Sequence, residues 1–176
     1  GCLINACAST LNNKIIDMKN FRIVPLSKEY AANIRRTGKD AFEHDVVEQV
    51  ATGRGPCRVS LRSFVPGKDK RLLFTHTPFE KDNVYNQPGP VFISAEETEP
   101  YTDIYHFPEE IKNDKEHYQI TLIGYDVNQM MVYTRLVKEE DIDELIERIF
   151  NKHHEVHYLH ARNATAGCFI CKVERI

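Results

Sequence analysis

Short apolar runs rich in aromatic and β-branched residues recur along the chain, and clusters of turn-forming residues separate them. This composition and spacing are typical of β-strands joined by turns. We therefore predict strands at residues 21–24, 57–64, 72–77, 90–94, 118–125 and 130–137. Residues 155–175 predict two further strands that are joined by a short turn.

Three segments have the spacing of apolar residues that is typical of a helix. The first begins after the N-cap Ser27 and ends at about Arg36, because Gly38 favours a helix stop. The second is predicted from apolar residues that recur four positions apart, and it ends at Gly53. These apolar residues are Phe42, Val46 and Val50. The third and clearest is residues 139–152, with one apolar stripe, acids in its first turn and basic residues at its end.

The order of the predicted elements is β-α-α-β-β-β-β-β-α-β-β, and most strands follow one another through hairpin turns. This order predicts an α+β fold: a mainly antiparallel sheet, with the C-terminal amphipathic helix and the short N-terminal helices packed on it. The length of 176 residues suits one domain. We expect a single globular domain at residues 18–176, preceded at residues 1–17 by an extension or a cloning remnant, because Met18 could be the natural start.

Two of the predicted loops are long, at about residues 78–90 and 95–116. The second is rich in acidic and aromatic residues and is longer than a plain connection needs. It is either a lid or ligand-binding loop, or an excursion into solvent.

The charge balance limits the classes of partner. The formal net charge is only -3, so there is no general attraction to nucleic acid or to an anionic membrane, and we expect neither as a partner. Any site for an anionic ligand must therefore be local. No apolar run approaches the ~18 residues that cross a bilayer. The five cysteines are odd in number and lack the spacing of a disulfide framework, which favours a cytoplasmic protein.

Two residue pairs near the C-terminus have the spacing of zinc ligands, His157 with His160 and Cys168 with Cys171. On a regular strand, however, residues three apart point to opposite faces, so neither pair chelates as a unit. A redox role for the two cysteines would need a helix N-terminus, and this strand offers none. We predict no metal and no cofactor, and expect a hairpin with alternate residues buried.

Arg58, Ser60 and Arg62 share one face of the predicted strand 57–64. Two guanidinium groups about 7 Å apart on a rigid strand could bind a carboxylate or a phosphate. Arg162 and Asn163, in the turn of the C-terminal hairpin, are predicted as further ligand-binding residues. The alternative is a solvated sheet face whose arginines pair with neighbouring acids.

Cys168 is the candidate nucleophile, with His160 as its catalytic partner. If the hairpin closes across residues 163–167, His160 is expected to lie near Cys168 or one position from it. A nearby imidazole and the guanidinium of Arg162 would favour the thiolate. Cys57, which precedes an arginine, is the other candidate. Both cysteines also fit a structural role, because unpaired cysteine usually behaves as a small buried apolar residue.

Five stretches together carry a family resemblance. They are Phe21–Leu26, Gly55–Arg62, Gly89–Ile93, Gly124–Asp126 and His160–Phe169. In combination they resemble the small bacterial proteins grouped as domain of unknown function family 1203, over about residues 18–176. The resemblance implies a bacterial, cytoplasmic single domain and no defined activity. The family pattern implies a Gly-Cys pair followed by an aromatic residue without a second cysteine, so it favours Cys168 over Cys171.

Three classes of function remain. The first is a domain that binds a small anionic metabolite, with or without catalysis, and it predicts that residues 57–62 and 160–168 converge on one pocket. The second is a cysteine-dependent enzyme that uses Cys168 or Cys57, which requires a histidine nitrogen within hydrogen-bond reach of the sulfur. The third is a non-enzymatic protein-interaction module with an exposed apolar patch or sheet edge. The sequence leaves the substrate, the presence of an activity and the oligomeric state open.

Overall fold

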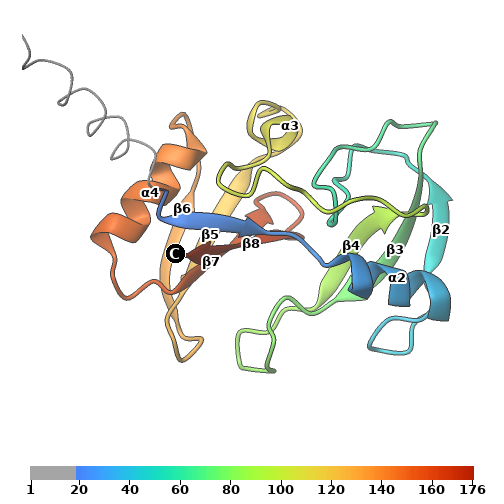
Figure 1. Cartoon of the computed structure of the whole chain (residues 1–176), viewed down its shortest axis with the longest axis horizontal. Helices are drawn as coiled ribbons and strands as arrows, with labels where there is room; N and C mark the ends of the chain where they lie inside the picture. Colours follow the sequence, from blue (N-terminus) through green and yellow to red (C-terminus); the bar gives the residue numbers. More distant parts are fainter. Residues whose placement is uncertain (1–18) are drawn as a thin grey trace, which may run out of the picture.

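The computed structural model describes residues 19–176, and in this part of the chain two antiparallel sheets stand side by side (Figure 1). The larger sheet has the order β1-β8-β7-β5-β6, with β1 (Phe21–Val24), β5 (Ile120–Tyr125), β6 (Met131–Leu136), β7 (Tyr158–Asn163) and β8 (Phe169–Arg175). The smaller sheet has the order β2-β3-β4, with β2 (Val47–Val50), β3 (Lys70–His76) and β4 (Gly89–Ser94). The helices are α2 (Lys28–Thr37), α3 (Glu109–Lys112) and α4 (Ile142–Lys152).

The fold is α+β and mainly antiparallel, as predicted, but its strands are divided between two sheets instead of one. The chain leaves the larger sheet after β1, builds the smaller sheet from β2, β3 and β4, and returns through residues 95–119. Each sheet has its own buried apolar cluster, so the apolar side chains are divided between two cores and the strands between two sheets. The predicted N-terminal extension, residues 1–17, and Met18 lie outside the described residues.

Helix α2 is bounded by its capping residues. The Ser27 hydroxyl accepts a hydrogen bond from the Tyr30 amide at 3.1 Å, and the Gly38 amide donates to the Ile34 carbonyl at 3.0 Å. Gly38 has a φ of 64°, a backbone conformation that glycine adopts at little cost. The predicted start and stop of this helix are confirmed. Ala31 and Ile34 turn inward and join the apolar cluster of the smaller sheet.

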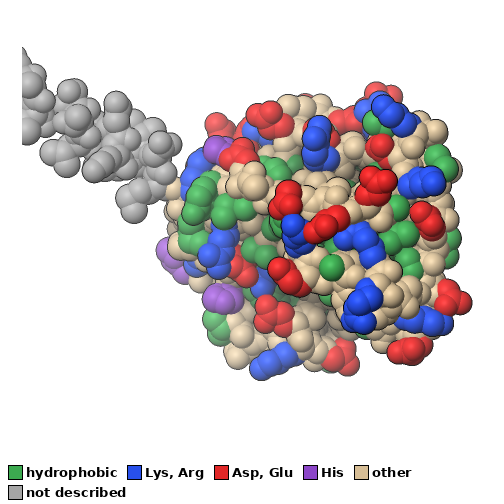
Figure 2. Space-filling view, turned by 45° about the vertical axis from the view of Figure 1, so that its right-hand side comes forward, with side chains coloured by type: hydrophobic (Ala, Val, Ile, Leu, Met, Phe, Trp, Pro, Cys, Tyr) green, Lys and Arg blue, Asp and Glu red, His purple; other side chains and the backbone are tan. Residues whose placement is uncertain are grey.

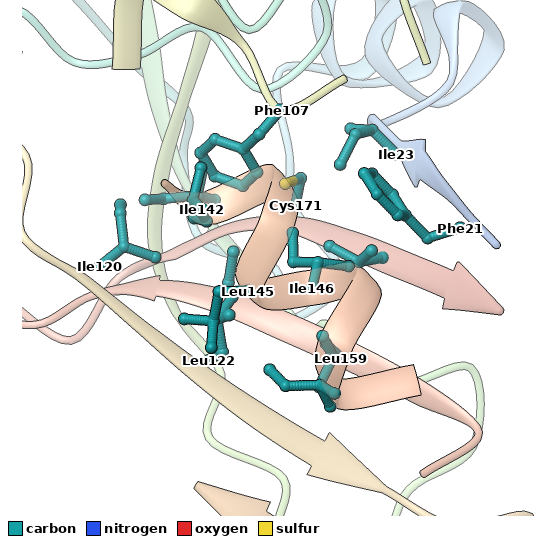
Figure 3. Close-up of a cluster of buried hydrophobic side chains, with 14 of the residues drawn as sticks. Phe21, Ile23, Phe107, Ile120, Leu122, Ile142, Leu145, Ile146, Leu159 and Cys171 are labelled. Carbon is teal, nitrogen blue, oxygen red and sulfur yellow. The ribbon is translucent and has the colours of Figure 1, made fainter. Parts of the chain in front are cut away.

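Helix α4 lies on one face of the larger sheet. The carboxylate of its N-cap, Asp141, accepts hydrogen bonds from two amides of the first turn, so the helix begins at Ile142 and not at residue 139 as predicted. Figure 3 shows its apolar side chains facing those of the strands, with the sulfur of Cys171 among them. Burial raises the pKa of the Cys171 thiol to about 12. Cys171 is thus a small core residue.

Residues 57–64, predicted as a strand, form a tight turn instead. The Leu61 amide donates to the Cys57 carbonyl at 2.8 Å, and the Cys57 amide donates to the Arg62 carbonyl at 2.9 Å. The alternation of apolar and polar residues was misleading because the apolar residues serve two different cores. Val59 lies in the cluster of the smaller sheet, whereas Leu61 lies in the cluster of the larger sheet.

The second predicted helix, expected to end at Gly53, is also wrong. Its last residues form β2, which pairs with β3 so that Glu48 lies opposite Leu72. Phe42 and Val50 are exposed, so the four-residue spacing of apolar side chains buries no helix face. Pairing with the backbone of β3 outweighed the local pattern.

No helix among residues 19–176 is long and apolar enough to cross a bilayer. Figure 2 shows acidic and basic side chains interspersed on the face that it displays. On that face there is therefore no broad patch of one charge.

The Asp40 carboxylate fastens the loop before β2 to β3. It accepts hydrogen bonds from the amides of Phe42 at 2.8 Å, His44 at 3.0 Å and Thr75 at 2.9 Å. Burial alone would raise the pKa of Asp40, but these bonds outweigh burial and hold the pKa below its usual range. Because the pKa is lower in the folded state, the ionised carboxylate stabilises the fold above about pH 3.8, and this contribution is lost as the pH falls through the folded-state pKa.

We expect Asp40→Asn to lower the free energy of unfolding at neutral pH by about 2 kcal/mol, because the new amide group cannot accept all three hydrogen bonds. The difference from wild type should shrink as the pH falls below about 3.8, as urea unfolding across pH would show. Asp45→Asn is the control, since the ion pair of Asp45 with Lys39 is exposed and contributes little. A constant difference at all pH values would contradict this assignment.

Candidate functional site

The face of the larger sheet that looks away from α4 carries most of the polar chemistry. Strand β7 places Leu159 and Ala161 in the core beneath α4, so the alternating residues Tyr158, His160 and Arg162 point to the opposite side. The neighbouring strands add Tyr125, opposite Tyr158, and Lys172, opposite His160. We call this surface the histidine face; its members are Tyr125, Tyr158, His160, Arg162 and Lys172.

Four aromatic rings surround His160 on the histidine face. The centroid of its imidazole lies 4.7 Å from that of Phe79, 5.0 Å from Tyr125, 5.1 Å from Phe169 and 5.3 Å from Tyr158. Phe79 comes from the long loop between β3 and β4, which therefore covers this face of the sheet. The rings leave His160 with no exposed surface.

Both ring nitrogens of His160 are buried and form no hydrogen bond within the described part of the chain. The residue His160 lies beside a hollow of about 240 Å³ that is lined by residues 78–81, by the turn between β5 and β6 and by side chains of β7 and β8. Buried polar groups are nearly always paired, so a fully buried imidazole with two free nitrogens calls for a functional explanation. The hollow beside it offers room for a partner.

Lys172 stands on the same side of the hollow. Its ammonium lies 4.6 Å from the centroid of the Tyr158 ring, 3.2 Å from a carboxylate oxygen of Glu174 and 3.8 Å from one of Glu80. The Glu80 side chain is 89% exposed, so that contact is weak. An anionic ligand could replace Glu80 beside Lys172 at little cost.

The surroundings keep His160 uncharged. Burial, together with the positive charges of Arg162 and Lys172, lowers the pKa of His160 to about 3. Near neutral pH the imidazole therefore has one N–H donor and one acceptor nitrogen. His76 behaves similarly: burial, with Arg58 and Arg162 nearby, lowers its pKa to about 4. Its Nδ1 shares a hydrogen bond of 3.0 Å with the hydroxyl of Tyr30.

The residues predicted in the hairpin turn shape the turn itself. Asn163 accepts hydrogen bonds at its side-chain oxygen from the amides of Thr165 and Ala166, both at 2.9 Å. Arg162 is buried and donates from Nη1 to the Gly167 carbonyl at 2.8 Å, while its Nε has no partner among the described residues. Arg162 thus contributes charge to the histidine face, and Asn163 is occupied by the backbone.

The three residues predicted on one strand face are separated by the turn at 57–64. Arg58 is buried and donates from Nε to the Phe169 carbonyl at 2.8 Å, so the segment 57–62 contacts the start of β8, one residue beyond the predicted segment 160–168. Arg62 is exposed and bonds to Glu110 at 3.3 Å, and the Ser60 hydroxyl accepts from the Arg62 amide at 3.4 Å. The predicted row of Arg58, Ser60 and Arg62 is not formed, because the strand that would align them is absent.

Ser60 and Arg62 line a different hollow, of about 550 Å³, at the edge of the smaller sheet. The Thr98 hydroxyl there is buried and unpaired within residues 19–176. A hollow of about 560 Å³ lies between α3 and the start of α4, where Lys112 is paired with Asp141. These hollows are larger than the one at His160, but neither adjoins a fully buried ring with two unpaired nitrogens, so we favour the histidine face as the site.

The predicted pair of Cys168 and His160 forms no hydrogen bond. His160 lies opposite Lys172 in the ladder between β7 and β8, not opposite Cys168, and neither of its nitrogens bonds to a sulfur. The bulge after Ala161 contributes to this register. Cys168 is half-buried, and Cys57 is buried in the cluster of the smaller sheet.

A metal centre finds no support in the described part of the chain. Within residues 19–176 there is no group of three or more His, Cys, Asp and Glu side chains that could hold a metal ion. The four residues with zinc-like spacing do not face one centre, because Cys171 lies beneath α4 whereas His160 lies on the histidine face.

The sequence analysis did not single out Phe79, Tyr125, Tyr158 or Lys172. One of these residues could have been found from the sequence. Tyr158 is two positions from His160 on a predicted strand, and side chains two positions apart lie on the same face. Phe79 and Tyr125 come from distant segments, and no local pattern places them beside His160.

A sequence profile of the family described as "Protein of unknown function (DUF1203)" matches residues 54–175 of this chain. The match contains every predicted site residue and all of the histidine face, whereas residues 18–53 of the expected range lie outside it. No curated protein and no solved structure matches the chain.

Proposed function

This chain belongs to the DUF1203 family, whose description names no activity, and we propose that it binds a small anionic molecule in the hollow beside His160. The observation that carries the proposal is the fully buried imidazole of His160, which lies beside that hollow and whose two nitrogens have no hydrogen-bond partner in the described chain. A ligand that accepts a hydrogen bond would complete this group.

The charge of the surrounding groups favours an anion. Arg162 and Lys172 are close enough to His160 to lower its pKa, and Arg162 forms no ion pair within residues 19–176. The neutral imidazole would donate one hydrogen bond to the ligand, and the Lys172 ammonium would supply the opposite charge. Phe79 and Tyr158 would shield both interactions from water.

The size of the hollow limits the ligand to a few heavy atoms. At about 240 Å³ it is smaller than the ~300–1,000 Å³ typical of sites for drug-sized molecules. A short carboxylate or a phosphate fits this description, whereas a nucleotide does not. Catalysis is not part of the proposal, because the low pKa of His160 makes it a poor base near neutral pH.

His160→Phe is expected to raise the free energy of unfolding by about 1 kcal/mol, because it removes two buried, unpaired nitrogens and keeps a ring among rings. The substitution should also make the free energy of unfolding depend less on pH. The pKa of His160 is about 3 in the fold and 6.5 when unperturbed, so wild type loses stability as the pH falls below about 6.5, and the variant loses less because only the contribution of His76 remains of the two. Urea unfolding at several pH values checks both effects. A variant that is less stable than wild type at neutral pH would argue that the nitrogens have a structural role.

The binding test uses inorganic phosphate, acetate and malonate as probes. Titration of the protein, followed through the ¹⁵N resonances of the imidazoles, should show a probe that shifts the His160 signals. Lys172→Met and His160→Phe should each weaken that probe about 10-fold or more, as expected for loss of a charge-assisted hydrogen bond. Lys68→Met and Arg62→Ala serve as controls at the other hollow. If only these two variants abolish binding, the site lies at Arg62 and the proposal is wrong.

A further inference from the structure

The turn between β5 and β6 forms one wall of the hollow beside His160, and it contains Gln129, a residue with an unusual backbone angle. The φ of Gln129 is 62°, in the left-handed region that glycine adopts at little cost and that longer side chains rarely adopt. The Asp126 amide donates to the Met130 carbonyl at 2.9 Å, and the Gln129 amide donates to the Asp126 carbonyl at 3.0 Å. This pattern is typical of a three-residue hairpin loop that ends in a left-handed residue, which is usually glycine. The chain therefore has glutamine at a position where glycine would be less strained.

A second turn of the same kind shows that this backbone by itself does not indicate a function. The Glu43 amide donates to the Asp40 carbonyl, the Asp40 amide donates to the His44 carbonyl, and the φ of Glu43 is also 62°. The Glu43 side chain is exposed and forms no hydrogen bond within residues 19–176. The Gln129 side chain, in contrast, is half-buried and lines the hollow. The two turns thus share a backbone and differ in what the side chain contacts.

The amide group of Gln129 has one bonded end and one free end. Its Oε1 accepts a hydrogen bond from Nδ2 of Asn83 at 3.3 Å, which ties the turn to the loop that carries Phe79. Asn83 is itself held in place, because its Oδ1 accepts from the Tyr85 amide at 2.8 Å. The Nε2 of Gln129 donates to no residue in the described part of the chain. It is therefore a free hydrogen-bond donor at the wall of the hollow.

Gln129 is better oriented than other polar side chains that line the hollow. The side chains of Lys81 and His157 are exposed and form no hydrogen bond within residues 19–176, so each loses rotamer freedom when it binds a ligand. Gln129 is half-buried and its amide group is bonded to Asn83, so part of this entropy is already lost in the free protein. Its donor complements the charge that Lys172 supplies.

We propose that Gln129 is a ligand-binding residue of this hollow and that its Nε2 donates a hydrogen bond to the bound anion. This inference rests on the proposed function, since it concerns the same hollow and the same class of ligand. The imidazole of His160, the ammonium of Lys172 and the amide of Gln129 come from three different segments, and each offers a donor. Three such donors suit an anion with several acceptor oxygens, such as a carboxylate or a phosphate. The strained backbone at position 129 is then retained for binding and not for stability.

Substitution of Gln129 separates binding from folding. Gln129→Gly removes the donor and the backbone strain together, so it should unfold at the same urea concentration as wild type or at a higher one. Gln129→Met keeps the length of the side chain and the backbone strain but has no donor. Both variants should weaken binding about 10-fold, as expected for loss of a hydrogen bond to a charged group. The probes are inorganic phosphate, acetate and malonate, followed through the ¹⁵N resonances of the imidazoles.

Glu43→Gly is the matched control, because it relieves the same backbone angle in the other turn. It should bind the probes as wild type does, and a loss of binding there would show that the effect does not come from the Gln129 donor. If His160→Phe and Lys172→Met weaken a probe that either Gln129 variant binds as tightly as wild type, the site stands and the role of Gln129 is wrong. If no probe shifts the His160 signals of wild type, both are wrong. A lower urea midpoint for Gln129→Gly would contradict the inference, because Gln129 would then be retained for stability.

Discussion

Arg58→Ala is expected to remove about 4 kcal/mol from the free energy of unfolding. Arg58 is 2% exposed, and its guanidinium donates to the carbonyls of Phe169, Gly55 and Pro56. Burial lowers the pKa of Arg58 to about 10, so the side chain remains charged at neutral pH. The alanine variant leaves carbonyl oxygens without donors and a space between the two sheets, and both effects destabilise the fold.

A second substitution at position 58 separates the contribution of the charged hydrogen-bond donors from that of the side-chain volume to the free energy of unfolding. Arg58→Met fills most of the space but supplies no donors, so it should cost about 2–3 kcal/mol, less than alanine. Arg62→Ala is the control, because its bond to Glu110 is exposed and should be worth less than about 0.5 kcal/mol. With no tryptophan in the chain, circular dichroism at increasing urea is the measurement. A loss below about 1 kcal/mol for Arg58→Ala would contradict its role as the link between the sheets.

Asp143→Ala is expected to cost about 3 kcal/mol. The buried Asp143 carboxylate accepts from the Phe107 amide at 2.7 Å and pairs with Lys112 at 2.8 Å, which joins α4 to the loop that returns to the larger sheet. The hydrogen bonds to Asp141 and Asp143 raise the pKa of Lys112, so its ammonium stays charged and keeps Asp141 as its partner in the variant. Without Asp143, the buried amide of Phe107 has no acceptor.

Asp143→Asn keeps an acceptor oxygen for the Phe107 amide, so it should cost only about 1 kcal/mol. Glu144→Ala, at the next position of the same helix turn, is exposed and provides the control. Hydrogen exchange gives a local measurement, because the Phe107 amide should lose protection in Asp143→Ala before the rest of the chain does. Unchanged protection at Phe107 would show that Asp143 does not anchor this loop.

Local sequence signals placed the elements that depend on neighbouring residues. The start and stop of α2 follow from Ser27 and Gly38, which act within one helix turn. The hairpin of β7 and β8 was likewise expected from two apolar runs and a short turn. The antiparallel α+β class follows from the order of such elements, and the motifs in that order were enough to indicate the family that the profile matches.

Long-range packing decided where local patterns gave the wrong answer. Val59 and Leu61 have the spacing of one strand face, yet each enters a different apolar cluster, because the turn at residues 57–64 lies between two cores. Arg58 was expected to face solvent or a ligand, and it is buried because carbonyl groups of two distant segments satisfy its guanidinium. An alternation of apolar and polar residues along the sequence predicts neither the two separate cores nor the burial of Arg58.

The candidate site shows the same division. The sequence alone determined that Tyr158, His160 and Arg162 share one face, because side chains alternate along any strand. Only the tertiary structure brought Phe79 and Tyr125 to His160, placed Lys172 opposite it in place of Cys168, and left its two nitrogens unpaired. The physical reason is that strand order, register and loop cover depend on contacts between residues far apart in the chain.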